Sequence, residues 1–250
     1  MARTFNRARR TAKGSNARMN APAGTPSRTP SPPGSADRPA GFSTAARIAG
    51  SDGASALRIA RNIGDPWFRC QALAHVAWHA TDHRRFIALI VESLKSGWSI
   101  QNPNRSVTVI AWPVAALARR SYPGPDARER GAGILRGGIA RLTEVIAKEP
   151  SPASRADALL LHIHASPSRP KLRKGVLGLL VKECRAPANR KRQRQLEEAA
   201  LVIAADDPDE ALELAVLLDE DRRRRATAKI EGQGEGLGAR RFFEMSGTPR

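Results

Sequence analysis

The chain alternates between stretches with apolar residues at helical spacing and short polar breaks. From Thr44 onward, apolar residues return at every third or fourth position, as at Leu57, Ile59, Ala60 and Ile63. This spacing is that of one buried face of an α-helix. The pattern predicts an all-α fold with helices in pairs, at residues 53–63, 66–79, 82–96, 103–119, 127–148, 152–165, 170–184, 188–205, 208–218 and 220–230.

The breaks between predicted helices share a local signal. In four of them a residue whose side chain accepts hydrogen bonds comes directly before a proline, at Asp65-Pro66, Asn102-Pro103, Ser151-Pro152 and Asp207-Pro208. Such a side chain satisfies the unpaired N–H groups at a helix start, and proline fits the first helical position. We therefore expect each of these dipeptides to end one helix and begin the next.

An arginine recurs shortly after these breaks, at a nearly fixed period. The arginines are Arg69, Arg105, Arg155, Arg190 and Arg224, at steps of 36, 50, 35 and 34 residues. The long step contains an insertion, residues 121–135, that begins as a loop and lengthens the following helix. A period of about 35 residues is typical of a helical solenoid, whose units bury their apolar faces only against their neighbours. We predict a right-handed α-solenoid of about five helix pairs.

The recurring arginines have a structural and a functional interpretation. A cation in the first turn of a helix opposes the helix dipole, so a partner group must compensate it. In the structural interpretation, each arginine bonds carbonyls or acids of the adjoining unit, for example Arg69 with Asp65 or Asp82. In the functional interpretation, the arginines form a row of cations that receives an acidic partner. Repetition in every unit favours the structural interpretation.

Composition divides the chain into three parts. Residues 1–43 are rich in Pro, Gly and Ser and have few bulky apolar residues, which predicts a disordered basic tail. Residues 44–230 form the predicted array, and residues 231–250 a Gly-rich C-terminal tail. That tail carries Phe242, Phe243 and Met245, which we interpret as a cap on the last unit or as a short motif for a partner.

The first of these breaks, with the residues that follow it, resembles a known class of proteins. It contains the pattern I-x-D-P-x-x-R-x-x-A-L at Ile63, Asp65, Pro66, Arg69, Ala72 and Leu73. With this pattern, residues 44–230 resemble the tetratricopeptide and HEAT class of helix-pair arrays. The resemblance implies a concave surface that binds other macromolecules, usually proteins.

The formal net charge of +18 is unevenly distributed. Residues 1–43 hold eight Lys and Arg against one Asp, and residues 169–194 hold ten against one Glu. Clustered cations can neutralise several phosphates together, which makes the second stretch a candidate nucleic-acid contact. Its candidate residues are Lys171, Arg173, Lys174, Arg190, Lys191, Arg192 and Arg194. Single-strand binders add aromatic stacking faces, and this stretch has none, so a solvated helix surface remains the alternative.

Other clusters have structural interpretations. His75, His79 and His83 are spaced by four residues, but zinc needs further ligands and the HEXXH motif is absent. Thr81 and Asp82 predict a new helix cap, which puts His83 on the next helix. An acidic cluster, Asp206, Asp207, Asp209 and Glu210, stands where the helix starting at Pro208 favours negative charge. Two glycine runs, in 131–138 and 232–238, lack the Gly-Lys-Ser/Thr end of a phosphate loop.

The remaining features restrict location. The longest apolar run, 12 residues from Val107, contains Pro113 and is too short to span a bilayer. The two cysteines, Cys70 and Cys184, suggest no disulfide framework, so a reducing, cytoplasmic location is expected. The Arg-rich, acid-poor N-terminus is also compatible with an organelle transit segment.

Together these features predict a non-enzymatic scaffold or adaptor that binds a protein partner on the surface of a helical array. No catalytic residue, cofactor or metal is predicted. The alternative is a nucleic-acid-binding protein without sequence readout, which would use the basic tail and residues 169–194.

Overall fold

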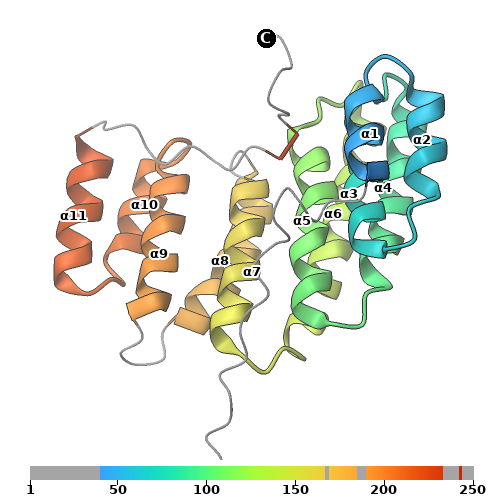
Figure 1. The fold of residues 1–250 in the computed structure, drawn as a ribbon. Coiled ribbons are helices and arrows are strands. Elements are labelled where there is room, and N and C mark those ends of the chain that lie inside the picture. The colour runs from blue at the N-terminus through green and yellow to red at the C-terminus, as the bar shows by residue number, and fades with distance from the viewer. Residues whose placement is uncertain (1–39, 167–168, 185–189, 233–241, 244–250) are drawn as a thin grey trace, which may run out of the picture. The chain divides into compact units, whose positions relative to one another are not determined.

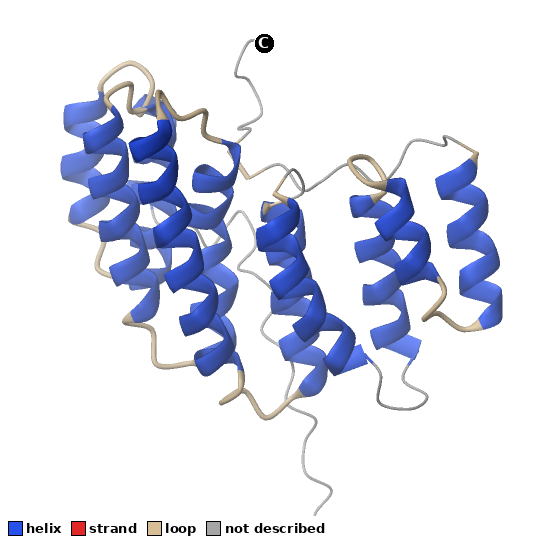
Figure 2. Ribbon diagram, turned by 180° about the vertical axis from the view of Figure 1, so that it is seen from behind, coloured by secondary structure: helices blue, strands red, loops and turns tan. Residues whose placement is uncertain are grey.

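The computed structural model describes residues 40–166, 169–184, 190–232 and 242–243, and the side chains of residues 190 and 191 are outside this description. Within these ranges the chain is helical and contains no strand (Figures 1 and 2). The helices are α1 (Ala40–Ile48), α2 (Gly53–Arg61), α3 (Pro66–His79), α4 (His83–Trp98), α5 (Pro103–Arg119), α6 (Pro125–Ile146), α7 (Pro152–Ala165), α8 (Pro170–Cys184), α9 (Arg190–Ile203), α10 (Pro208–Ala215) and α11 (Glu220–Glu231).

Most helices pack against their neighbours in the sequence, although α6 packs mainly on α5 and α8, and the odd-numbered helices also contact one another in turn. The most extensive contact joins α3 and α4, and α7 with α8 and α9 with α10 form similar hairpins. Contacts of α1 with α3, α3 with α5, α5 with α7, α7 with α9 and α9 with α11 form a continuous row (Figure 1). The predicted all-α fold is therefore confirmed for the described residues.

The four predicted caps are confirmed, because each dipeptide begins a helix at its proline. The side chains of Asp65, Asn102, Ser151 and Asp207 accept backbone N–H bonds at distances of 2.8, 2.8, 3.3 and 3.0 Å. Each bond satisfies an N–H group that has no partner within its own helix. The sequence therefore determines these four helix starts locally.

A helix precedes those predicted, and it changes the pairing. Helix α1 begins at Ala40, inside the segment 1–43 that composition assigns to the tail. Its Phe42 is 1% exposed, because α1 packs on α2 and α3. Consequently α3 forms a hairpin with α4 rather than with the helix before it. The helical spacing that begins at Thr44 covers only the C-terminal half of α1.

Helix α5 continues through an internal proline. Pro113 has no N–H to donate, so the carbonyl of Val109 loses its helical partner. The thiol Sγ of Cys70 on α3 lies 3.8 Å from that oxygen. A side chain of the neighbouring helix thus partly replaces the missing backbone bond.

The buried residues form two clusters. One is built mainly from α1 to α5 and the other mainly from α7 to α11. Alanines contribute many of the completely buried positions in both, and their small side chains allow the helices to approach closely. Among the described helices, none combines the length and apolarity needed to cross a bilayer.

Candidate functional site

Two of the recurring arginines have the same structural role. Arg69 donates from Nη1 to the carbonyl of Ile63 at 3.2 Å, and Arg155 donates from Nη1 to the carbonyl of Glu149 at 2.6 Å. Both acceptors lie six residues earlier, in the turn that follows the preceding helix. Carbonyls there have no intrahelical donor and form the negative end of the helix dipole. Each guanidinium therefore stabilises the turn before its own helix.

The same two arginines also reach another helix. Arg69 donates from Nε to the hydroxyl of Ser96 on α4 at 3.0 Å, and Arg155 pairs with Glu183 on α8 at 2.7 Å. Asp65 and Asp82, the acids expected to bind Arg69, instead cap α3 and α4. Both arginines are thus engaged in packing between helices.

The other recurring arginines differ from this arrangement. Arg105 pairs with Asp65 at 3.7 Å, and its guanidinium lies 5.4 Å from the ring centre of Trp67. Arg224 is exposed and pairs with Glu220, one turn earlier on its own helix. The side chain of Arg190 lies outside the described residues. The regular steps in the sequence therefore do not correspond to one repeated contact.

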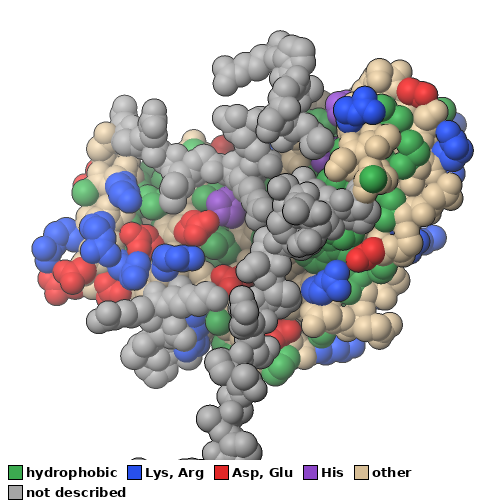
Figure 3. All heavy atoms as spheres, viewed as in Figure 1, with side chains coloured by type: hydrophobic (Ala, Val, Ile, Leu, Met, Phe, Trp, Pro, Cys, Tyr) green, Lys and Arg blue, Asp and Glu red, His purple; other side chains and the backbone are tan. Residues whose placement is uncertain are grey.

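The basic candidates of residues 169–194 do not form one exposed set. Lys171, Lys174 and Arg194 are exposed, whereas Arg192 is half-buried and donates to the carbonyl of Glu183 at 2.9 Å. The side chain of Lys191 lies outside the described residues. Over α9 to α11, Lys and Arg side chains on the face drawn in Figure 3 alternate with Asp and Glu. Acids at this spacing reduce the attraction for phosphate.

Arg173 is buried and does not contribute to an exposed basic surface. Its side chain is 1% exposed and binds the carboxylates of Asp207 and Glu210. Removing either partner of such a buried ion pair would leave an uncompensated charge in the interior. A substitution on one side alone would therefore destabilise the fold. The acidic cluster at the start of α10 therefore both caps that helix and neutralises Arg173.

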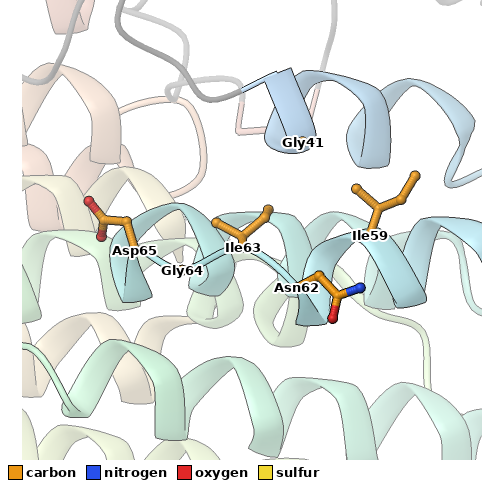
Figure 4. Close-up of a pocket in the computed structure, with 6 residues that line it drawn as sticks. All are labelled: Gly41, Ile59, Asn62, Ile63, Gly64 and Asp65. Carbon is orange, nitrogen blue, oxygen red and sulfur yellow. The ribbon is translucent and has the colours of Figure 1, made fainter.

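A shallow pocket lies where α1 passes over the turn between α2 and α3 (Figure 4). Its volume is about 370 Å³, and its lining residues are Gly41, Ile59, Asn62, Ile63, Gly64 and Asp65. The Asp65 carboxylate is already engaged by the N–H of Trp67 and by Arg105. The pocket thus offers apolar surface and one amide.

The histidines and cysteines form no metal-binding group within the described residues. His75 and His79 lie on α3 and His83 begins α4, as the predicted cap at Asp82 requires. No group of three His, Cys, Asp or Glu side chains in the described ranges could hold a metal ion. Burial raises the pKa of Cys70 to about 12 and that of Cys184 to about 11, so both thiols stay protonated at neutral pH.

An aromatic surface forms on α3 and α5, and residues from the C-terminal segment occupy it. The ring of Phe243 stacks on Trp78, with ring centres 4.8 Å apart and planes 6° from parallel. Phe242 meets Trp112 edge-on at 5.4 Å. We call this region the aromatic surface, and it comprises His75, Trp78, Trp112 and Arg119.

Buried polar contacts hold this surface in place. In the amide orientation that satisfies both groups, Gln71 Oε1 accepts the indole N–H groups of Trp67 and Trp112, each at 3.2 Å. Gln71 is buried, and Trp112 remains half-buried with the phenylalanines in place. The Trp112 ring is therefore fixed from the inside and contacts Phe242 and Phe243.

Helical spacing did not reveal this surface, because it joins residues from distant parts of the chain. The available signals were the scarcity of tryptophan, four in the chain, and the adjacent phenylalanines in a Gly-rich tail. The interpretation of Phe242 and Phe243 as a cap on the last helix pair is wrong, because both rings lie on α3 and α5.

Comparison with known proteins identifies no relative. No family model matches the chain, and neither a curated protein nor a solved structure is significantly similar to it.

Proposed function

We propose that the protein is a non-enzymatic scaffold that binds a protein partner on the surface of its helical array. The array is a right-handed α-solenoid of about five helix pairs, of the tetratricopeptide or HEAT type. Such arrays offer extended surfaces for other macromolecules. The predicted cytoplasmic location stays a prediction.

One observation carries this proposal: α3 and α5 hold an aromatic pair from a separate part of the chain. Aromatic and arginine side chains are enriched where proteins bind one another. Trp78, Trp112 and Arg119 combine these types on two adjacent helices. The surface is thus suited to a protein segment rather than to a small molecule.

The nucleic-acid alternative has less support. Of its seven candidate cations, Arg173 is buried against acids and Arg192 is engaged with a carbonyl. Only Lys171, Lys174 and Arg194 are exposed among the candidates whose side chains are described. The net charge of +18 nevertheless keeps this alternative worth testing.

Affinity purification of the full chain, with nuclease treatment, tests the proposal. We expect specific proteins to remain bound after nuclease treatment and to remain bound to a matched variant, Lys171→Gln/Lys174→Gln/Arg194→Gln. The physical reason is that an aromatic contact does not depend on these charges. Duplex binding is measured in parallel by fluorescence anisotropy between 50 and 200 mM salt, a range over which a protein with about six or more phosphate contacts loses affinity roughly 10³-fold or more.

Two results would contradict the scaffold proposal. One is that no protein survives nuclease treatment. The other is tight duplex binding that falls steeply with salt and is lost in the neutralised variant, which would favour the nucleic-acid alternative.

A further inference from the structure

The side chains of Phe242 and Phe243 are buried against the aromatic surface, as the side chains of a bound ligand would be. Phe242 is 3% and Phe243 8% exposed. Besides stacking on Trp78, the Phe243 ring meets His75 at 5.2 Å and Trp112 at 5.6 Å, both nearly perpendicular. Edge-to-face and offset stacked contacts are the favoured geometries of aromatic pairs. The two rings thus meet aromatic partners on several sides.

The aromatic surface is assembled by contacts that do not involve these phenylalanines. His75 lies 5.3 Å from Trp112 and 5.8 Å from Phe42, between ring centres. Gln71 fixes the indole of Trp112 from below. Because α3 packs on both α1 and α5, the surface is preorganised for its occupant.

The chemistry of the surface selects aromatic occupants. The guanidinium of Arg119 lies 5.7 Å from the ring centre of Phe242. A cation over a ring, and an edge against a ring face, both need the π electrons that an aliphatic side chain lacks. Two adjacent aromatic residues therefore satisfy the surface better than two leucines.

The position of this pair in the sequence favours occupation within one chain. Nine residues, 233–241, separate the end of the array at Gly232 from Phe242. A short connection of this kind gives an effective concentration on the order of millimolar. A segment from another protein must therefore compete with Phe242 and Phe243 for the aromatic surface.

We propose that the aromatic surface is a docking site for a partner segment with two adjacent aromatic side chains, and that Phe242 and Phe243 occupy it as an internal competitor. This inference rests on the proposed scaffold function and adds the chemistry of the partner and its regulation. Binding of a partner then requires displacement, modification or removal of the C-terminal segment.

The test uses the full chain and a fluorescent peptide with the sequence of residues 239–250. We expect the peptide to bind the double variant Phe242→Ala/Phe243→Ala, because the rings that contact Trp78 and Trp112 have been removed. A millimolar internal competitor is expected to weaken binding to the unmodified chain by about tenfold for a peptide whose dissociation constant is about 0.1 mM, and by more for a tighter peptide. Fluorescence anisotropy gives both dissociation constants.

Two matched controls identify the surface and its selectivity. Adding Trp78→Ala to the double variant removes the stacking face, so peptide binding is expected to be lost. A peptide with leucine at both phenylalanine positions is expected to bind the double variant at least about fivefold more weakly, because π contacts are absent. Circular dichroism confirms that each variant keeps its helices.

Several outcomes would overturn the inference. The first is a folded double variant that does not bind the peptide, and the second is equal binding to both chains. A third is an unmodified chain that is a dimer and becomes monomeric in the double variant, which would make a second copy the occupant. These outcomes are measured by peptide binding and oligomeric state, whereas failure of the scaffold function is measured by affinity purification, so the two failures are distinguishable.

If the double variant does not fold, a protease site inserted after Gly234 replaces it. After cleavage of the otherwise unmodified chain, the labelled peptide is expected to exchange onto the array while the helices persist. Unfolding upon loss of the cleaved segment would show that the two phenylalanines are core residues and would overturn the inference.

Discussion

At the scale of single residues, several polar groups act as packing elements between helices. Arg69 and Arg155 bind carbonyls of the turns that precede their helices, although their spacing alone also fits a row of cations for a partner. His162 is similar, since its Nε2–H donates to the carbonyl of Val107 on α5 at 2.8 Å. The two arginines satisfy carbonyls that have no helical donor, whereas the carbonyl of Val107 satisfies the buried N–H of His162.

His162 predicts a dependence of stability on pH. Burial lowers its pKa from 6.5 to about 4, against a smaller opposing effect of the Val107 bond. Between pH 6.5 and pH 4 the unfolded imidazole binds a proton that the folded one does not, so acid favours unfolding. This contribution is fully present above pH 6.5 and is lost as the pH falls toward 4.

We expect a loss of about 1.4 kcal/mol per pH unit from this residue, or about 3 kcal/mol in total. The measurement is the free energy of unfolding in urea at several pH values, for the unmodified chain and for His162→Gln. Glutamine keeps an N–H donor but does not titrate, so its profile should be flatter over this range. Parallel profiles for the two proteins would show that His162 is not the group responsible.

At the scale of elements, the contact of α4 with α3 and α5 depends on a glycine. A Cβ atom at Gly97 would lie 2.5 Å from Cδ1 of Ile110 and 3.2 Å from Sγ of Cys70. The same Cys70 faces the carbonyl that Pro113 leaves without a helical donor. The close approach of α4 to α3 and α5 thus requires a glycine at position 97. The spacing of apolar residues along the sequence does not reveal this requirement.

We predict opposite effects of the same substitution at two helical glycines. Gly97→Ala is expected to lower the free energy of unfolding by about 1–2 kcal/mol, because overpacking outweighs the higher helix propensity of alanine. Gly178→Ala on α8, where a Cβ meets nothing within 4 Å, is expected to raise it by about 0.5–1 kcal/mol. Urea unfolding measures both.

A second substitution tests the cause of the Gly97 effect. Ile110→Val removes the atom nearest to the new methyl group, so Gly97→Ala/Ile110→Val should cost less than the sum of the two single changes. A Gly97→Ala protein as stable as the original would mean that α4 can move away from α5 at no cost.

At the scale of the whole described array, the two hydrophobic clusters suggest partly independent stability. Leu214 on α10 belongs to one cluster, and Ile90 on α4 belongs to the other. In a row of helices that contact mainly their neighbours, a local cavity destabilises the adjacent units most. The contact of α5 with α7 connects the two halves.

Native-state hydrogen exchange is expected to separate these clusters. Leu214→Ala leaves a cavity that costs about 2–5 kcal/mol and should increase exchange in α9 to α11 more than in α3 and α4. Ile90→Ala is the matched control and should show the reverse distribution. An equal increase in all helices after either substitution would instead show that the array unfolds as one cooperative unit.

Much of the helical framework could be predicted from local sequence. The breaks at Asp65-Pro66 and Asn102-Pro103 specify a cap and a first helical residue within two positions, so their prediction needs no distant contact. Helix α1 lacked such a signal, because its stability comes from burying Phe42 against helices that follow it. Arg173 was misplaced for a related reason, since its acidic partners lie more than thirty residues away.

The sequence by itself determined what depends on neighbouring residues: the helices after α1, the four capped helix starts and the amphipathic faces that must be buried. These follow from backbone hydrogen bonding and from the period of the α-helix, which operate over a few residues. Only the tertiary structure decided which arginines are buried, which helices form hairpins and where Phe242 and Phe243 lie. Those outcomes depend on contacts between residues far apart in the chain, and one linear pattern is compatible with many such contacts.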